Sequence, residues 1–221
     1  MNILHIDCSP RLASHSRLLS AAIVGKLLSM APEAHVFRRD LGYEPIPHTT
    51  ATYADALATP ASLSAAGRSA EAVLLGEQLI EEVERSDAIV IGTPLNNFTV
   101  PSVMKAWIDQ ILRVGRTMKS TPTGKTGMLE DRPVFVGIAS GGVFMGDRAN
   151  QPDFLTPYLS AAFGCIGLKS VHYLPLQATA FIDEARAAEL RHSLVAAIQP
   201  EMAGIFTATL NSESQACALH P

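Results

Sequence analysis

A doubly wound α/β domain is the fold class that the sequence predicts, with a parallel sheet covered by helices on both faces. The apolar runs of the chain are short and lack polar alternation, as expected of parallel strands buried on both faces. Segments with a helical spacing of apolar residues separate these runs, which is the pattern of doubly wound sheets. The length of 221 residues suits one sizeable domain and is short for two.

Five segments are predicted to form the strands of this sheet. Four of them are strongly apolar, and the segment 35–40 is weaker. In chain order the predicted strands are 3–7, 35–40, 88–93, 133–139 and 171–175. Ligands of open α/β sheets bind beyond the carboxyl ends of the strands, at the topological switch point. A functional site is therefore expected in the loops that directly follow the strands.

Helical patterns occupy the connections between the strands. In the first of them, Leu19, Ile23 and Leu27 are spaced by four residues and form one apolar face. The predicted helices are 16–30, 66–85, 100–113, 153–166 and 182–202.

The segments between these elements carry weaker patterns. Residues 41–65 are predicted to be a long irregular connection, and 118–131 a loop or a hairpin. We expect residues 1–202 to form a single domain and residues 203–221 to be a C-terminal tail that is partly disordered.

Composition excludes several classes of partner. A net charge of −4 argues against nucleic acid or an anionic membrane as the main partner, because both attract concentrated basic surface. The chain is 48% hydrophobic and only 17% charged, which indicates that some surface is buried against a partner. Its three cysteines, Cys8, Cys165 and Cys217, have neither zinc spacing nor the even count of a disulfide framework. No metal site is predicted, and a reducing, cytoplasmic location is expected.

The loop after the first strand is rich in serine. Ser9, Ser14 and Ser16 lie between that strand and the start of the next helix. Hydroxyl donors, free backbone N–H groups and the positive end of the helix dipole together suit a phosphate group. The alternative is that Ser14 or Ser16 only caps the helix.

Two other chemistries of this loop can be set aside. It contains no glycine, so it lacks the G-x-G-x-x-G pattern of a dinucleotide-binding turn. Cys8 stands where a low-molecular-weight tyrosine phosphatase has its nucleophile, but Ser14 occupies the position of the required arginine. Cys8 is therefore predicted to be a small packed residue.

Two later loops have features of a ligand site. After the strand 88–93, prolines at 94 and 101 stiffen a polar and aromatic stretch that could present N–H groups and an amide to a planar heterocycle. After the strand 133–139, Gly141 and Gly142 permit a close approach of backbone to ligand. Each loop alone could be an ordinary turn. Their coincidence with the serine loop, at one edge of the sheet, favours a binding site.

At these loops the chain resembles the FMN-dependent NADH:quinone oxidoreductase and azoreductase family of flavodoxin-like fold. The resemblance runs from residue 1 to about 202 and is most specific over 87–116, which contains DAIVIGTPLNNFTVPSVMKAWIDQ. The run DFLTPYL at 153–159 supports it, followed by Phe163, Gly164 and Gly167. This family is homodimeric, with the flavin near the dimer interface.

The resemblance assigns roles to the three loops. By analogy with the family, Ser9 and the turn Ser14, His15 and Ser16 would hold the FMN phosphate. The isoalloxazine ring would be wrapped on one side by Leu95, Asn96, Asn97 and Phe98, and lined on the other by Ser140, Gly141 and Gly142.

Three positions depart from the family pattern. Asn96 stands in place of a usual tyrosine, and His15 in place of a usual glutamine. The segment Leu176 to Ala178 stands in place of an alanine-glutamate-glycine stretch. The first and third of these positions line the substrate side in relatives, so they bear on which acceptor is used.

The activity that the resemblance implies is hydride transfer from NADH or NADPH to FMN, and then to quinones or aromatic azo compounds, in a ping-pong reaction. The flavin carries this chemistry, so no side chain is assigned a catalytic role. A non-enzymatic FMN electron carrier is one alternative, and an NADPH-specific quinone or nitro reductase on the same scaffold is another.

Overall fold

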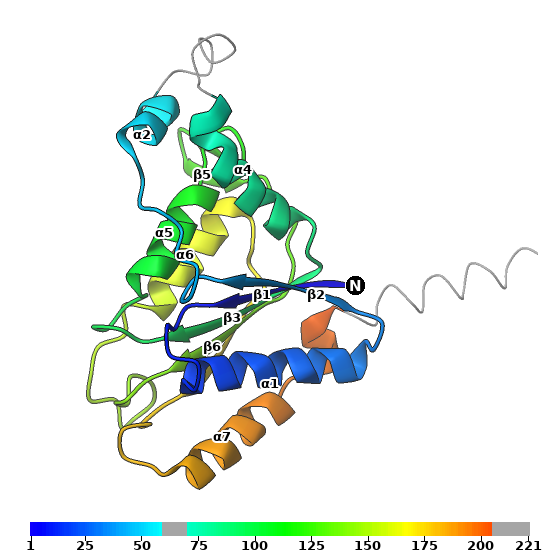
Figure 1. Cartoon of the computed structure of the whole chain (residues 1–221), viewed down its shortest axis with the longest axis vertical. Coiled ribbons are helices and arrows are strands. Elements are labelled where there is room, and N and C mark those ends of the chain that lie inside the picture. Colours follow the sequence, from blue (N-terminus) through cyan, green and yellow to red (C-terminus); the bar gives the residue numbers. More distant parts are fainter. Residues whose placement is uncertain (59–69, 205–221) are drawn as a thin grey trace, which may run out of the picture.

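A five-stranded parallel sheet forms the centre of the protein, with strand order β2-β1-β3-β6-β7 (Figure 1). The computed structural model of the chain describes residues 1–58 and 70–204. The strands are β1 (Asn2–Asp7), β2 (His35–Asp40), β3 (Ala88–Pro94), β6 (Val134–Ala139) and β7 (Val171–Leu176). All five predicted strands are confirmed, with ends that differ by at most one residue.

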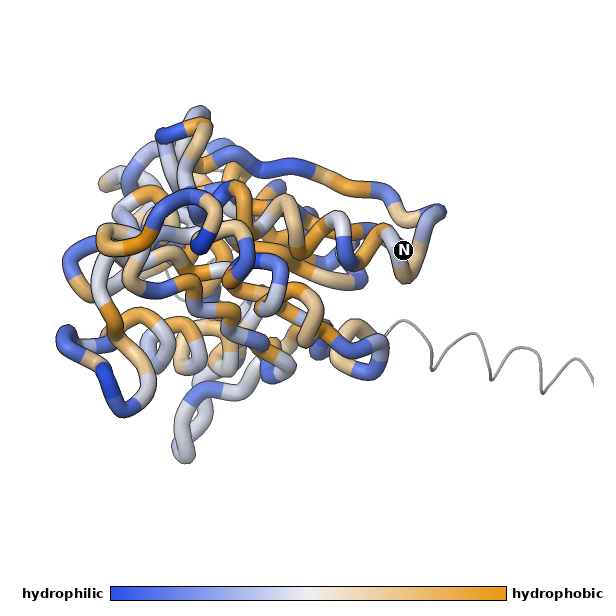
Figure 2. Tube along the Cα trace, turned by 90° about the horizontal axis from the view of Figure 1, so that it is seen from below, coloured by the Kyte–Doolittle hydropathy of each residue, from blue (hydrophilic) through white to orange (hydrophobic). Residues whose placement is uncertain are grey.

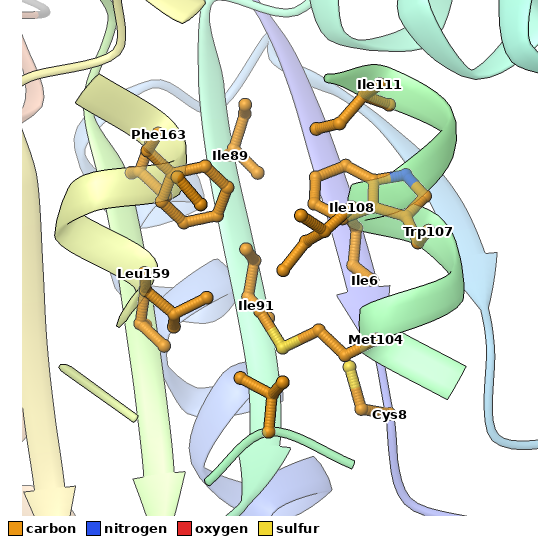
Figure 3. Packing of buried hydrophobic residues seen from close by; sticks show 14 of the residues in the cluster. Ile6, Cys8, Ile89, Ile91, Met104, Trp107, Ile108, Ile111, Leu159 and Phe163 are labelled. Atoms are coloured by element: carbon orange, nitrogen blue, oxygen red, sulfur yellow. The ribbon is translucent and has the colours of Figure 1, made fainter. Parts of the chain in front are cut away.

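Helices cover both faces of the sheet, as predicted. On one face lie α1 (His15–Met30) and α7 (Glu184–Ala196); on the other lie α4 (Ala70–Glu84), α5 (Ser102–Ile111) and α6 (Thr156–Ile166) (Figure 1). Strand side chains alternate between two apolar cores. Val90 packs in the core under α1, while Ile89 and Ile91 point to the opposite core with Trp107 of α5 and Phe163 of α6 (Figure 3). Figure 2 shows the apolar segments gathered in the interior and polar residues along the outer turns.

Cys8 belongs to the second of these cores. It is only 1% exposed and lies beside Met104 (Figure 3). Burial raises the pKa of the Cys8 thiol well above its usual range, so the reactive thiolate is not formed at neutral pH. The prediction that Cys8 is a packed small residue is confirmed.

The connection 41–65 was predicted to be irregular throughout, and this is wrong for part of it. Helix α2 (Ala51–Ala58) lies within it, while 59–65 fall outside the described residues, as do 66–69 of the predicted helix 66–85. Only Tyr53 and Ala56 of α2 are buried, so its apolar pattern is too short to reveal a helix. The Tyr53 hydroxyl donates to the Gln110 carbonyl over 3.4 Å, which holds α2 against α5.

The predicted helix 182–202 is interrupted. Helix α7 ends at Ala196, and a short 3-10 helix η2 (Pro200–Ala203) follows. Pro200 lacks an N–H group and disfavours helical backbone at the residue before it, and Gln199 accordingly has an extended ψ of 152°.

The segment 118–131, predicted to be a loop or a hairpin, contains an antiparallel hairpin of β4 (Met118–Thr121) and β5 (Gly124–Gly127). Residues 205–221 of the predicted tail lie outside the described residues. Among the residues that the structure describes, no helix is both long enough and apolar enough to span a membrane.

Candidate functional site

A cavity of about 580 Å³ opens where four loops meet at the carboxyl ends of β1, β3, β6 and β7. Its volume is within the range of roughly 300–1,000 Å³ that is typical of small-molecule sites. It lies beside the topological switch point of the sheet, where the sequence predicted a site. The lining residues are Ser9, Pro10, Arg11, Ser14, His15, Ser16, Pro94, Leu95, Asn96, Ala139, Gly141, Thr179 and Ala180.

The serine turn forms one end of this cavity. The Ser14 hydroxyl caps α1 by accepting from the N–H of Arg17 over 3.3 Å. Ser14 also lines the cavity, so its contact with a phosphate stays a prediction. The Ser16 hydroxyl lies 3.2 Å from that of Ser14, and the Ser9 hydroxyl accepts from the N–H of Arg11 over 3.3 Å. The hydroxyl proton of Ser9 therefore remains available to an acceptor in the cavity.

Backbone donors add to this end of the cavity. The first N–H groups of a helix have no acceptor within the helix. For His15 and Ser16, no acceptor lies elsewhere in the described residues either. These N–H groups, the helix dipole and the lining residue Arg11 together favour an anionic group.

The loop after β3 is a tight turn stabilised by two backbone hydrogen bonds between Asn96 and Thr99, each of 3.0 Å. Its two central residues have left-handed backbone, with φ of 47° at Asn97 and 72° at Phe98. Such a conformation strains a bulky residue such as Phe98, and strain of this kind is concentrated at functional sites. The N–H of Phe154 donates to the Phe98 carbonyl over 3.0 Å and helps to hold the turn.

This turn faces the cavity with its first half only. Leu95 and Asn96 line the cavity, whereas Asn97 and Phe98 are exposed beside it. The loop after β3 was predicted to be either an ordinary turn or part of a ligand site, and the structure is compatible with both. The turn forms, and it places Leu95 and Asn96 at the cavity.

The loop after β6 contributes one bare stretch of backbone. A side chain at Gly141 would meet only the Cβ of Ala180, at 3.5 Å, so the cavity side of this glycine is open. Ser140 is 2% exposed and accepts from the Gln151 amide over 2.7 Å. A Cβ at Gly142 would lie 2.9 Å from that same side chain. Of the three predicted residues, only Gly141 lines the cavity; the other two pack against Gln151.

The loop after β7 contributes two residues to the cavity that were not predicted; the resemblance had pointed to Leu176 to Ala178 of this loop instead. Thr179 and Ala180 line the cavity, and Thr179 donates to the Ser140 carbonyl through its N–H and its hydroxyl, over 3.0 and 3.1 Å. Gln177 supports the neighbouring loop by accepting from the N–H groups of Phe144 and Met145 over 2.8 and 2.9 Å. Ligand sites lie beyond the carboxyl ends of parallel strands, and this rule holds for β7 as well. Applied to β7, it would have predicted Thr179 and Ala180.

Arg11 also lies in the site without having been predicted there. It lines the cavity beside the serine turn, as does His15. The Nδ1 atom of His15 is buried, has no hydrogen-bond partner in the described residues, and lies 3.8 Å from a carboxylate oxygen of Glu184. Among the residues that the structure describes, no aspartate or glutamate lines the cavity. The formal charge in this lining is the positive charge of Arg11, which suits an anionic ligand.

Comparisons with known proteins agree with this fold. The profile of a family described by its flavodoxin-like fold matches residues 1–199. FMN-dependent NADH:quinone oxidoreductase 4 of Pseudomonas fluorescens is 45% identical over 190 residues, which cover 86% of this chain and 90% of that protein. FMN-dependent NADH:quinone oxidoreductase 5 of Burkholderia lata is 44% identical and covers 83% and 88% of the two chains.

The chain belongs to the FMN-dependent NADH:quinone oxidoreductase family. The predicted family is thereby confirmed. Solved structures share the fold of this oxidoreductase: an azoreductase from Bacillus anthracis has a TM-score of 0.75 at 22% identity, covering 93% of this chain and 98% of that one. An FMN-dependent NADH-azoreductase from the same species, in complex with FMN, has a TM-score of 0.74 at 23% identity, covering 88% and 95%.

Proposed function

We propose that this protein is an FMN-dependent oxidoreductase that transfers two electrons from NADH to quinones and aromatic azo compounds. The names of its relatives support the predicted enzyme class and the predicted cofactor. The observation that carries the proposal is the cavity itself. It joins a serine-rich helix start at one end to a strained turn and bare backbone at the other.

The residues present fit FMN. Unpaired N–H groups at His15 and Ser16, with the Ser9 hydroxyl, would hold the phosphate. Leu95 and Asn96 on one side and Gly141 on the other would contact the flavin ring. The contacts of Ser140, Gly142, Asn97 and Phe98 with FMN remain predictions.

When bound, FMN supplies the group that accepts a hydride and passes it on. The chain contributes orientation. It fixes the phosphate end through α1 and limits where a planar ring can lie through the turns after β3 and β6. Within the described part of the chain, no carboxylate lines the cavity and none is positioned there as a base, while Arg11 would stabilise negative charge.

The direct test is to add FMN or FAD to the purified, flavin-free protein and then to measure NADH oxidation with a quinone. We expect one FMN per chain, no tight binding of FAD, and turnover that depends on FMN. Binding of FMN without turnover on any quinone or azo compound would favour the alternative of a non-enzymatic electron carrier. Rates with NADPH in place of NADH test the NADPH-specific alternative.

The kinetics are expected to be ping-pong. The donor and the acceptor must each bring a reacting atom within about 3–3.5 Å of the flavin, and both would use the open side of the same cavity. Double-reciprocal plots at several fixed acceptor concentrations should therefore be parallel. Intersecting lines, together with a detectable ternary complex, would require two separate substrate sites.

Asn96→Tyr is expected to improve the use of bulky aromatic acceptors. Asn96 lines the cavity, and a tyrosine there would add an apolar ring on which a planar acceptor can stack. Stacking of about 0.5–1.5 kcal/mol corresponds to a KM that is a few-fold to roughly tenfold lower. The measurement compares KM for an azo dye and for a small quinone, with FMN affinity as the control. Unchanged acceptor preference would mean that the Asn96 side chain serves only the turn.

A homodimer with the flavin near the interface is part of the proposal. Large apolar side chains are exposed on loops that adjoin lining residues: Phe98 is 43% exposed, Phe154, whose N–H donates to the Phe98 carbonyl, is 60% exposed, and Phe181, next to Ala180, is 79% exposed. Covering these side chains with a second copy would remove apolar surface from water. Sedimentation should show a dimer. A stable monomer with full activity would contradict this prediction.

We also propose a cytoplasmic location, with neither nucleic acid nor membrane as a partner. The free thiols of Cys8 and Cys165, among the residues described, suit a reducing compartment. Cell fractionation would test this.

A further inference from the structure

Two residues that do not line the cavity meet the carbonyl group of Ser9. The Nε of Arg17 donates to the Ser9 oxygen over 2.8 Å. The second residue is Gly42, just after β2. A Cβ atom at Gly42 would be 2.2 Å from the Ser9 oxygen and 2.9 Å from the nitrogen of Pro10. Real Cβ atoms do not approach so closely, so only glycine leaves room for this loop.

Arg17 is itself fixed by Asp40, the last residue of β2. Two guanidinium nitrogens donate to the two carboxylate oxygens of Asp40 over 2.7 and 2.5 Å, and this bidentate geometry orients the side chain. Arg17 is 5% exposed. Its hydrogen bond holds the pKa of Asp40 below the usual range, so the pair is charged at neutral pH.

Asp7, at the end of β1, belongs to the same cluster of charged residues, which consists of Arg17, Asp40, Asp7 and Arg38. It lies opposite Asp40 in the parallel register and accepts from Arg38 over 2.7 Å and from Ser20 over 2.9 Å. Burial alone would raise the pKa of Asp7, but hydrogen bonds from His5, Arg38 and Ser20 lower it to about 2. Two arginines and two aspartates thus balance in formal charge. The group therefore acts through geometry, because it adds no net charge beneath the phosphate end of the cavity.

Fixing the Ser9 carbonyl determines which atoms of the loop face the cavity. A carbonyl oxygen turned toward the cavity would place negative partial charge beside a phosphate. With that oxygen bound to Arg17, the loop instead presents the Ser9 hydroxyl and the Arg11 side chain to the cavity.

We infer that Arg17 and Gly42 are positioning residues for the FMN phosphate: they fix the Ser9–Pro10 backbone, and thereby the groups that contact the phosphate. The inference rests on the proposed function. It assigns a binding role to the end of β2, an edge strand that does not itself line the cavity.

The test compares FMN with riboflavin, which has the same ring and no phosphate. Flavin-free wild type, Gly42→Ala and Arg17→Lys are titrated with each ligand, and ring fluorescence reports binding. Gly42→Ala changes no charge. Arg17→Lys keeps the positive charge but removes the guanidinium group that donates to both oxygens of Asp40. We expect FMN affinity to fall about tenfold or more in both variants, while riboflavin affinity changes by less than about twofold.

Gly25→Ala is the matched control, because this glycine lies in α1 and a Cβ there would meet no atom within 4 Å. It should bind both ligands as the wild type does. Circular dichroism and thermal melting identify any variant that fails to fold. The phosphorus NMR shift of bound FMN, measured in whichever variant folds, should differ from that of the wild type.

Three outcomes would overturn the inference or its basis. Equal losses for FMN and riboflavin would mean that Arg17 and Gly42 serve stability alone. Wild-type FMN affinity with an unchanged phosphorus shift would mean that the Ser9 backbone need not be fixed. A wild type that binds riboflavin as tightly as FMN would instead contradict the proposed phosphate site, and this is visible before any variant is made.

Discussion

Replacing Ser9 and Ser16 together by alanine is expected to weaken FMN binding by roughly a hundredfold or more. Hydrogen bonds to a charged group contribute about 1.5–3 kcal/mol each, so losing two costs on the order of 3–6 kcal/mol. Both residues line the cavity at the start of α1 and are buried, where water cannot replace the lost hydroxyls easily. Titration of the flavin-free double variant with FMN measures the loss.

The experiment leaves one serine unchanged and uses another as a control. Ser14 is left unchanged because its hydroxyl caps α1, and its loss would cost about 1 kcal/mol of stability by itself. Ser29→Ala, at the far end of the same helix, is the control, since the Ser29 hydroxyl only donates to the carbonyl of Lys26. An FMN affinity like that of the wild type in the double variant would place the phosphate elsewhere.

Gly141→Val is expected to abolish tight FMN binding while the protein stays folded. A side chain at this position would meet only Ala180 within the protein, and otherwise it would extend into the cavity. The methyl groups of valine would therefore occupy space that the proposal gives to the flavin ring. Titration with FMN and with riboflavin should show a loss for both, because the ring itself is excluded.

The fold of this variant is checked by thermal melting, with Gly164→Ala in α6 as a control at which a Cβ meets no atom within 4 Å. Unfolding of the Gly141→Val variant would instead support the alternative that this glycine is needed for the turn. Full FMN binding by a folded variant would place the ring on another side of the cavity.

The elements that the sequence predicted are those whose burial leaves a pattern. Strands β3 and β6 are buried on both faces, and this produces the apolar runs from which they were predicted. Strand β1 is buried in the same way, although its apolar run is interrupted by His5 and ends at Asp7. Helix α2 was missed because only two of its residues are buried. Pro200 indicates a break between α7 and η2, but the helix 182–202 was predicted from its apolar spacing, which continues past this proline.

The candidate site likewise contains residues that the sequence predicted and residues that it did not. Loop composition together with the family resemblance predicted seven residues that the structure brings to one cavity: Ser9, Ser14, His15, Ser16, Leu95, Asn96 and Gly141. Thr179 and Ala180 carry no distinctive chemistry and were not found. The packing of Ser140 and Gly142 against Gln151 depends on a loop contact that no local pattern records.

By itself, the sequence determined the parallel sheet, its two helical layers and the strand ends at which a ligand would bind, because burial periodicity and turn residues are local properties. Only the tertiary structure decided which residues of each loop face the cavity. It also showed that Gly42 and Arg17, at 33 and 8 residues from Ser9, hold the Ser9 carbonyl. Contacts of this kind depend on the parallel pairing of β1 with β2, which places Asp7 opposite Asp40. That register arises from the packing of the whole sheet, so no short stretch of sequence contains it.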